Sequence, residues 1–314
     1  MTGAVLYLGV DGGGTKTEFV CIDAAGSIVG RALTGTTYHL QVGLDGAAAF
    51  LEEGVRAICD QLSVTPDDFA FVFFGLPAFG EDALIDPQLE QACGRILGHA
   101  RFRCGNDMIC GWAGSLACND GINLVAGTGS IGYGERQGLA ARVGGWGEIF
   151  SDEGSAYWIA IRALNAFARM SDGRLPKGPL HRHIVTKLAL ADDLDLCAAI
   201  MGERGMSREE IAGLAPIASA AAADGDTVAA AILNEAASEL ASMAHALRQR
   251  LGFATGEIAE LSWSGGVLAG EPRVRDALER LLTESGGFRL VAPRHPPGLG
   301  AALYAAHLRK RTTA

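Results

Sequence analysis

The stretch VLYLGVDGGGTKTEFVCI, residues 5–22, decides the fold. It predicts an apolar strand over residues 5–10, the turn Asp11–Thr15, and a second strand that ends at Ile22. A two-residue hairpin turn needs one or two glycines, whereas this turn has three, followed by Thr-Lys-Thr. Because glycine has no Cβ, several backbone N–H groups of such a turn can point at one anion. The stretch therefore predicts a hairpin whose turn binds phosphate.

The same pattern returns in the middle of the chain. Residues 122–126 form an apolar run, the turn Gly127-Thr-Gly-Ser130 follows, and further strands run through Tyr133 and to Val143. Between the two patterns lie apolar residues at helical spacing and the run 69–76, which is typical of a strand buried on both faces. Two similar halves, each with a mixed sheet and helices, indicate an α/β protein with an internal duplication.

The second half then becomes mainly helical. We expect one helix over residues 151–170 and a helical segment near residues 211–223. A longer helix follows, in which Ile232, Leu240, Leu247 and the apolar residues between them form one stripe that faces a core.

The length of the chain favours two lobes. It has 314 residues, and a single hydrophobic core stops growing at about 250 to 300 residues. We expect one lobe over residues 1–117 and 297–314, a second over 118–296, and a cleft between them. In this division a final helix after Pro296-Pro297-Gly298 returns to the first lobe.

Composition argues against several classes of partner. The net charge of -10, from 36 acidic and 26 basic residues, repels nucleic acid and anionic lipid surfaces. The sequence has neither a signal-peptide pattern nor an apolar span of about 18 residues, so we expect a cytoplasmic protein with no membrane partner. The seven cysteines form no CxxC pair and are expected to be reduced. The oligomeric state stays open, and a homodimer is one alternative.

Two familiar glycine motifs are excluded by their details. Gly9 to Thr17 resembles a P-loop, but it has one residue too many before Lys16. Residues 127–132 read GxGxxG, and Asp152 follows at the distance that a dinucleotide fold requires. However, the next residues include further glycines and no cap, so they are poorly suited to open a helix.

Two acidic residues are candidates for chemistry. Asp107 follows a short strand at the start of a predicted helix, where catalytic carboxylates of α/β proteins lie, although it could serve only as an N-cap. Asp152 lies in a polar, glycine-rich stretch before Trp158, which suits a sugar because carboxylates bind hydroxyls and an aromatic ring covers an apolar face. Asp152 could equally cap that helix. The pair His181 and His183 fits a polar loop better than a metal site, since no third ligand is near.

Taken together, these motifs resemble the sugar kinases of the superfamily that contains actin and the heat-shock chaperones. The likeness is greatest to N-acetylglucosamine kinases and the wider BadF/BadG-type ATPase family. It rests on the ordered set GVDGGGT at residues 9–15, Asn106-Asp107, AGTGS at 126–130, GGWG at 144–147, SDEGS at 151–155 and SGG at 264–266. The resemblance implies a two-lobed actin-like (ribonuclease H-like) ATPase fold with duplicated mixed-sheet domains.

The resemblance also implies an activity and residue roles. The activity is transfer of the γ-phosphoryl group of ATP, with Mg²⁺, to the 6-hydroxyl of N-acetylglucosamine. Asp107 would be the general base, and Asp11 would lie near Mg²⁺ and contact it indirectly. The other roles it implies are ATP and phosphate binding for Gly13, Gly14, Thr15, Thr128, Gly129, Ser264, Gly265 and Gly266, and sugar binding for Ser130, Gly145, Trp146, Gly147 and Asp152, with Asp107.

One departure from the family leaves the sugar open. Such kinases usually carry an asparagine after the third strand, whereas here the stretch reads Thr36-Thr37-Tyr38-His39. His39 or Thr37 could replace the amide, and glucosamine or N-acetylmuramic acid is an alternative substrate. A different alternative is an ATPase that activates an iron–sulfur partner enzyme through a bridging cluster. That role needs a suitably placed cysteine, and none lies between Cys118 and Cys197.

Overall fold

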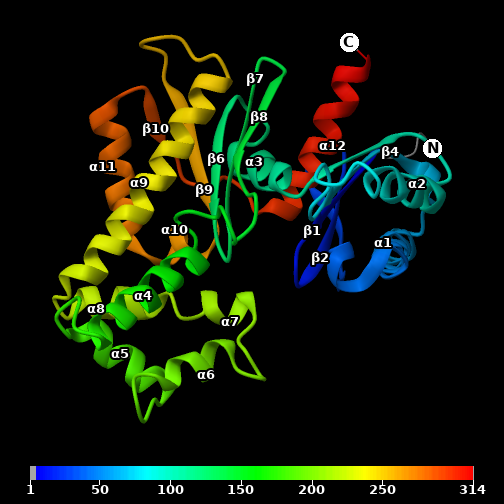
Figure 1. Ribbon diagram of the computed structural model, residues 1–314. Helices are drawn as coiled ribbons and strands as arrows, with labels where there is room; N and C mark the ends of the chain where they lie inside the picture. The colour runs from blue at the N-terminus through cyan, green and yellow to red at the C-terminus, as the bar shows by residue number, and fades with distance from the viewer. Residues whose placement is uncertain (1–4, 314) are drawn as a thin grey trace. The chain divides into compact units, whose positions relative to one another are not determined.

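The computed structural model describes residues 5–313 and divides into two compact units. Unit 1 runs up to Asp120 and resumes at Ala292, and unit 2 comprises Gly121–Val291. Each unit contains one five-stranded sheet (Figure 1). The boundaries expected from the sequence, 117/118 and 296/297, lie three and five residues from these.

The sheet of unit 1 combines a β-meander with two parallel strands. The meander pairs each strand antiparallel with the next, and the first strand also pairs in parallel with the fourth. The strand order is β3-β2-β1-β4-β5. The strands are β1 (Leu6–Gly12), β2 (Lys16–Ile22), β3 (Ile28–Gly35), β4 (Phe69–Leu76) and β5 (Phe102–Asn106).

Helices cover both faces of this sheet because successive side chains of a strand point to opposite sides. On one face, α1 (His39–Leu62) and α2 (Asp86–Leu97) bury Leu8 and Val10 of β1. On the other, α12 (Pro297–Thr313) covers Tyr7 and the side chains of Val20 and Ile22. Helix α3 (Met108–Leu116) packs beside α12, and the short 3-10 turn η1 (Pro66–Asp68) precedes β4.

Close backbone approach fixes α12 against unit 1. A Cβ on Gly9 of β1 would lie 2.0 Å from the backbone nitrogen of Ala302, and a Cβ on Gly300 would lie 2.3 Å from that of Gly114 in α3. Only glycine permits these contacts. The segment after unit 2 is therefore an integral part of unit 1, and Figure 1 shows α12 beside α3.

Unit 2 repeats the topology of unit 1. Its strand order is β10-β9-β6-β7-β8, with an antiparallel meander and two parallel strands. The strands are β6 (Gly121–Ala126), β7 (Ser130–Arg136), β8 (Leu139–Gly144), β9 (Ala259–Ser264) and β10 (Phe288–Leu290). The predicted duplicated α/β fold is thus confirmed. The GxGxxG stretch joins two antiparallel strands and does not lead from a strand into a helix, so a dinucleotide fold is absent here.

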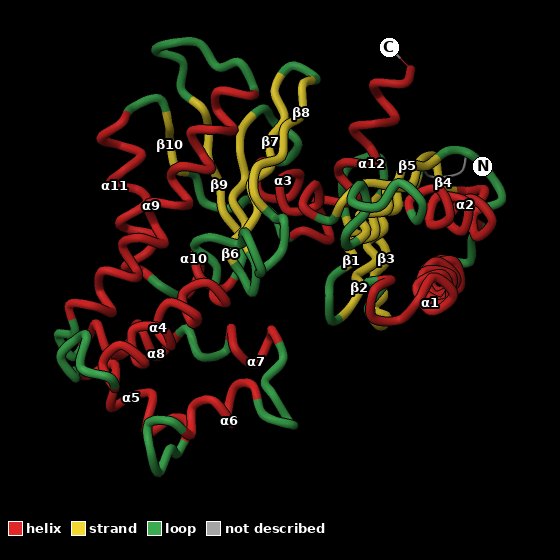
Figure 2. The backbone as a smooth tube through the Cα atoms, viewed as in Figure 1, coloured by secondary structure: helices red, strands yellow, loops and turns green. Residues whose placement is uncertain are grey.

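Unit 2 has eight helices. Three of them pack against its strands, and the others extend beyond the sheet, as the red segments of Figure 2 show. The expected helix over residues 151–170 begins only at Ala156, because the hydroxyl of Ser155 caps it. The expected segment 211–223 is two helices, since Gly213 ends one and Pro216 starts the next. The helices are α4 (Ala156–Ser171), α5 (Pro179–Leu188), α6 (Asp195–Met201), α7 (Arg208–Ala212), α8 (Pro216–Ala223), α9 (Thr227–Arg250), α10 (Gly266–Gly270) and α11 (Pro272–Ser285).

The long helix α9 packs across β6, β7 and β8 and carries the apolar stripe expected from the sequence. Its residues Ala236, Leu240 and Leu247 are fully buried in the core of unit 2. Among residues 5–313, no helix combines the length and apolarity needed to cross a membrane.

Candidate active-site residues

The first glycine turn, between β1 and β2, is open on its outer side. Gly14, Thr15 and Lys16 are exposed, and a Cβ on Gly14 would meet no atom within 4 Å. The backbone N–H of Gly13 donates a hydrogen bond to the carbonyl of Lys16 (3.0 Å), which closes the turn. Such an exposed glycine turn can accept an anion without moving any side chain.

Residues 36–39, which follow β3, pack against this turn on its inner side. The hydroxyl of Thr36 donates to the carbonyl of Gly13 (2.7 Å), and Thr37 packs so close to Gly12 that a Cβ there would lie 2.6 Å from its Oγ1. The adjacent His39, at the start of α1, is buried, and its Nδ1 has no hydrogen-bond partner among the described residues. The structure thus brings Thr37, one of the two predicted substitutes for the missing asparagine, to the first glycine turn. Thr37 is already paired with Thr17 (3.1 Å).

Asp107 lies directly after β5, at the N-cap position of α3. Its side chain makes no capping hydrogen bond to the helix, and the backbone N–H of Met108 donates instead to the Oδ1 of Asn106 (3.1 Å). Capping therefore does not explain the carboxylate of Asp107.

Asp11, at the end of β1, interacts with Asp107. Burial, and after it the negative charge of Asp107, raises the pKa of Asp11 to about 7. The buried thiol of Cys110 donates to the backbone carbonyl of Val10 (3.7 Å), and burial raises the pKa of that thiol, which keeps it protonated. Two neighbouring carboxylates with one raised pKa are typical of a site that shares a proton or receives a cation.

The second glycine turn, between β6 and β7, is tied to the start of α4. The backbone N–H groups of Ala156 and Tyr157 donate to the carbonyls of Gly127 (2.9 Å) and Thr128 (3.2 Å). The hydroxyl of Ser130 donates to the carbonyl of Glu153 (2.7 Å). These bonds fix the turn to the loop 151–155.

Asp152 lies over this second turn. It is 2% exposed and has a left-handed φ of 62°, which is uncommon for a residue with a side chain. Its Oδ1 accepts from the backbone N–H of Ser130 (3.4 Å), and its Oδ2 accepts from Nη2 of Arg208 in α7. Asp152 does not cap α4, so the alternative of a simple helix cap is excluded for it.

Sequence reasoning missed Arg208. The capping box of Ser207 and Glu210, with bonds of 3.2 Å and 2.7 Å, could have located the start of α7. Nothing in the sequence pattern links α7 to Asp152, because 56 positions separate Arg208 from that carboxylate.

The loop after β8 presents an indole. Gly144, Gly145 and Gly147 have φ values of 73°, 71° and 97°, which favour glycine, and Trp146 between them is 72% exposed. Trp158, which the sequence offered as an apolar face for a sugar, instead carries the guanidinium of Arg162 over its ring at 4.8 Å. Trp146 is therefore more accessible than Trp158, which is half-buried in α4.

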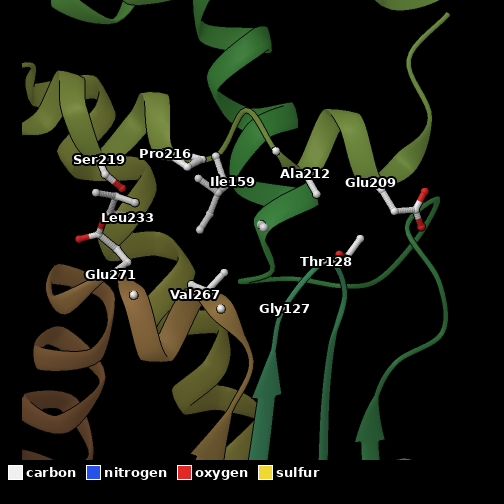
Figure 3. Close-up of a pocket in the computed structure, with 15 residues that line it drawn as sticks. Gly127, Thr128, Ile159, Glu209, Ala212, Pro216, Ser219, Leu233, Val267 and Glu271 are labelled. Carbon is white, nitrogen blue, oxygen red and sulfur yellow. The ribbon is translucent and has the colours of Figure 1, made fainter. Parts of the chain in front are cut away.

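A cavity of about 680 Å³ lies in unit 2 beside the second turn (Figure 3). The predicted nucleotide residues Thr128 and Gly266 line it, whereas Ser264 and Gly265 do not. Gly265 instead has a φ of 92° and approaches the carbonyl carbon of Ala126, which would lie 2.5 Å from an added Cβ. The remaining walls are mostly apolar, with Glu209 and Glu271 as acidic residues. They comprise Gly127, Ala156, Ile159, Glu209, Ala212, Gly213, Ala215, Pro216, Ser219, Leu233, Val267, Gly270 and Glu271.

The histidine pair has structural partners. His181 contacts Asp193 (2.9 Å) and stacks on Phe167, and His183 contacts Asp224 (2.8 Å). Within the part of the chain that the structure describes, no group of three or more histidine, cysteine or acidic residues is arranged to hold a metal ion.

Comparison with known proteins gives concordant matches. The model of the BadF/BadG/BcrA/BcrD ATPase family matches residues 8–305. An N-acetyl-D-glucosamine kinase of Dictyostelium discoideum is 29% identical, over 97% of this chain and 99% of the relative. An N-acetylmuramic acid/N-acetylglucosamine kinase of Clostridium acetobutylicum is 28% identical, over 95% and 97%. The solved structure of a provisional N-acetylglucosamine kinase from Chromobacterium violaceum superposes with a TM-score of 0.72 at 25% identity, over 96% and 99% of the two chains.

Proposed function

The chain belongs to the BadF/BadG/BcrA/BcrD ATPase family, and from this premise we propose that it transfers the γ-phosphoryl group of Mg-ATP to the 6-hydroxyl of N-acetylglucosamine. That it is an ATP-dependent carbohydrate kinase follows from the family and from relatives matched over nearly their whole length. The observation that best supports the finer proposal is Asp107, a carboxylate that follows a parallel strand and makes no capping bond. ATP as the donor places the proposed reaction in the cytoplasm.

The nucleotide has a suitable cavity in unit 2. A volume of about 680 Å³ falls in the usual range for small-molecule sites, and its apolar walls suit a base and ribose. Thr128 at one edge would contact the phosphates. In unit 1, the open turn Gly13–Thr15 would bind the terminal phosphates through backbone N–H groups.

The acidic pair of unit 1 fits a divalent cation. Asp11 is half-buried and its pKa is raised to about 7, so a cation nearby would stabilise its charged form. Since Mg²⁺ binds through one or two carboxylates and keeps water and phosphate oxygens as its other ligands, Asp11 alone would suffice for an indirect contact. The ion would neutralise charge on the transferred group.

The residues of the chain would perform four tasks. Asp107 accepts the proton of the sugar 6-hydroxyl as that oxygen forms a bond to the γ-phosphorus, and the bond to the β–γ bridging oxygen breaks to release ADP. Asp152 and the backbone of Gly145 and Gly147 bind hydroxyl and acetamido groups. Trp146 covers the apolar face of the ring. His39, with its unpartnered Nδ1, binds a further hydroxyl in place of the family asparagine.

The sugar is N-acetylglucosamine in this proposal because both curated relatives named above act on it. Backbone donors arranged for an acetamido group remain unpaired with glucosamine, and each unmet buried polar group costs about 1 to 3 kcal/mol. We expect at least a roughly tenfold higher kcat/KM for N-acetylglucosamine than for glucosamine or glucose.

A coupled assay of ADP release on N-acetylglucosamine, N-acetylmuramic acid, glucosamine and glucose tests the proposal. Nuclear magnetic resonance of the product locates the phosphate on the 6-oxygen. A preference for glucosamine or glucose would contradict the substrate, and ATP hydrolysis without any sugar turnover, in a protein that carries an iron–sulfur cluster, would support the activator alternative.

A further inference from the structure

Helix α7 begins with an arginine that contacts two acidic residues of the loop 144–155. Arg208 donates from Nη2 to Oδ2 of Asp152, and its Nε lies 3.2 Å from Oε2 of Glu148. The second contact is an ion pair without hydrogen-bond geometry, since this buried Nε has no hydrogen-bond partner among the described residues. Arg208 therefore has one hydrogen bond to Asp152, and its buried Nε is a donor without a hydrogen-bond partner among the described residues.

The guanidinium lies directly over the second glycine turn. A Cβ added to Gly129 would be 2.5 Å from Nη2 of Arg208 and 2.8 Å from Oδ2 of Asp152. A phosphate held at this turn would thus lie beside the ion pair.

The same short helix forms part of the nucleotide cavity. Glu209 and Ala212 of α7, and Gly213 after it, line the cavity together with Thr128 (Figure 3). Arg208 thus lies between two features of unit 2. One is the cavity proposed for ATP, and the other is the carboxylate proposed for the sugar.

Asp152 depends on this ion pair because its carboxylate is buried. The side chain of Asp152 is 3% exposed, whereas that of Arg208 is 34% exposed. A buried carboxylate that loses its partner is strongly disfavoured, so we expect the orientation of the Asp152 side chain to depend on Arg208. In the pairs Arg162–Glu235 and Arg289–Glu260, in contrast, neither side chain is as buried as that of Asp152.

We propose that Arg208 is a positioning residue, which holds Asp152 in its sugar-binding orientation and, through α7, makes sugar affinity depend on the nucleotide in the cavity. The proposal rests on the proposed function. It predicts reciprocal coupling, in which nucleotide tightens sugar binding and sugar tightens nucleotide binding by the same factor.

The test compares Arg208→Met and Arg208→Lys with Arg204→Ala, which removes an exposed arginine of the preceding loop. Calorimetry measures the Kd of N-acetylglucosamine with and without the Mg²⁺ complex of a non-hydrolysable ATP analogue, and steady-state kinetics measure both KM values. In the wild type the analogue is expected to tighten sugar binding by about 5-fold or more. In Arg208→Met we expect a sugar KM at least about 10-fold higher, loss of the coupling and a smaller change in the KM for ATP.

The control and the conservative variant make the result decisive. Arg204→Ala is expected to match the wild type, and melting temperatures verify folding. Arg208→Lys keeps the charge but lacks the guanidinium fork, so we expect a sugar KM about 3-fold higher and partial coupling, also when Arg208→Met fails to fold. Unchanged sugar KM and coupling in the folded Arg208 variants would overturn the inference. Absence of sugar turnover in the wild type would instead overturn the proposed function.

Discussion

The two glycine turns occupy equivalent positions in duplicated sheets, yet they differ in what covers them. The turn of unit 1 is exposed, and Gly14 has open space around it. The turn of unit 2 is bonded to the start of α4 and lies beneath Asp152 and Arg208. The register differs too, because the last pair before the first turn is Gly12 with Thr17, whereas Ala126 pairs with Ser130 at the second.

This difference indicates how one supersecondary unit acquires two tasks. The exposed glycines of the first turn offer backbone N–H groups, which can bind any phosphate. The second turn is hydrogen-bonded to the start of α4 and contacts the Arg208–Asp152 ion pair, so it also determines where these two side chains lie. We therefore expect sugar binding to tolerate a change at the outer edge of the first turn and to be sensitive to a change in the second turn.

The largest expected effect is on kcat, and it distinguishes Asp107 of unit 1 from Asp152 beside the second turn. Asp107→Asn should lower kcat by about 10²- to 10⁴-fold with little change in ligand affinity, because only proton acceptance is lost. Asp152→Asn should mainly raise the sugar KM. Steady-state kinetics and sugar binding by calorimetry distinguish the two. Retention of more than about a tenth of the wild-type kcat in Asp107→Asn would exclude it as the base.

A methyl group on each turn tests the contrast directly. Gly129→Ala forces a Cβ against Arg208 and Asp152, and we expect kcat/KM for the sugar to fall by about 10- to 100-fold, since displacements of about 1 Å can cost 10²-fold in rate. In Gly14→Ala the added Cβ meets no atom within 4 Å, so at saturating ATP we expect the kcat/KM for the sugar to stay within about threefold of the wild type. Any loss in this variant should appear in the KM for ATP, because this turn is proposed to bind the phosphates. Equal losses in both variants, at unchanged melting temperature, would remove the distinction between the turns.

The smallest expected effect concerns Asp11 beside the first turn. Its pKa is about 7 in the folded protein and 3.8 is the ordinary value, so between these pH values the folded state binds more protons than the unfolded state. Stability should therefore fall as pH rises through this window, by at most about 2 kcal/mol between pH 5.5 and 7.5. Urea unfolding of the ligand-free protein in EDTA measures it. Asp11→Asn should flatten this slope, and an equally steep slope in the variant would assign the titration to another group.

Sequence reasoning could predict the fold because its signals are local. The glycines at 12–14, 127 and 129, the apolar runs that precede them and the apolar stripe on α9 are each patterns of residues that are close in the chain. The site was harder to predict wherever it depends on distant residues. Asp152 and Trp146 could be proposed from their motif, but the arginine that binds Asp152 comes from a helix 56 positions away. Likewise, only the structure shows that Ser155 caps α4 and that Trp158 carries Arg162.

The placement of α12 has a consequence for synthesis of the protein on the ribosome. Unit 2, residues 121–291, is continuous in the chain and can fold as soon as it emerges. Unit 1 must wait for α12, and translation of the 171 intervening residues takes about 10 to 35 s at roughly 5 to 20 residues per second. During that time the apolar side chains of Tyr7, Val20 and Ile22 lack their cover. Chaperones can therefore bind this exposed apolar surface of the nascent first unit until α12 has been synthesised.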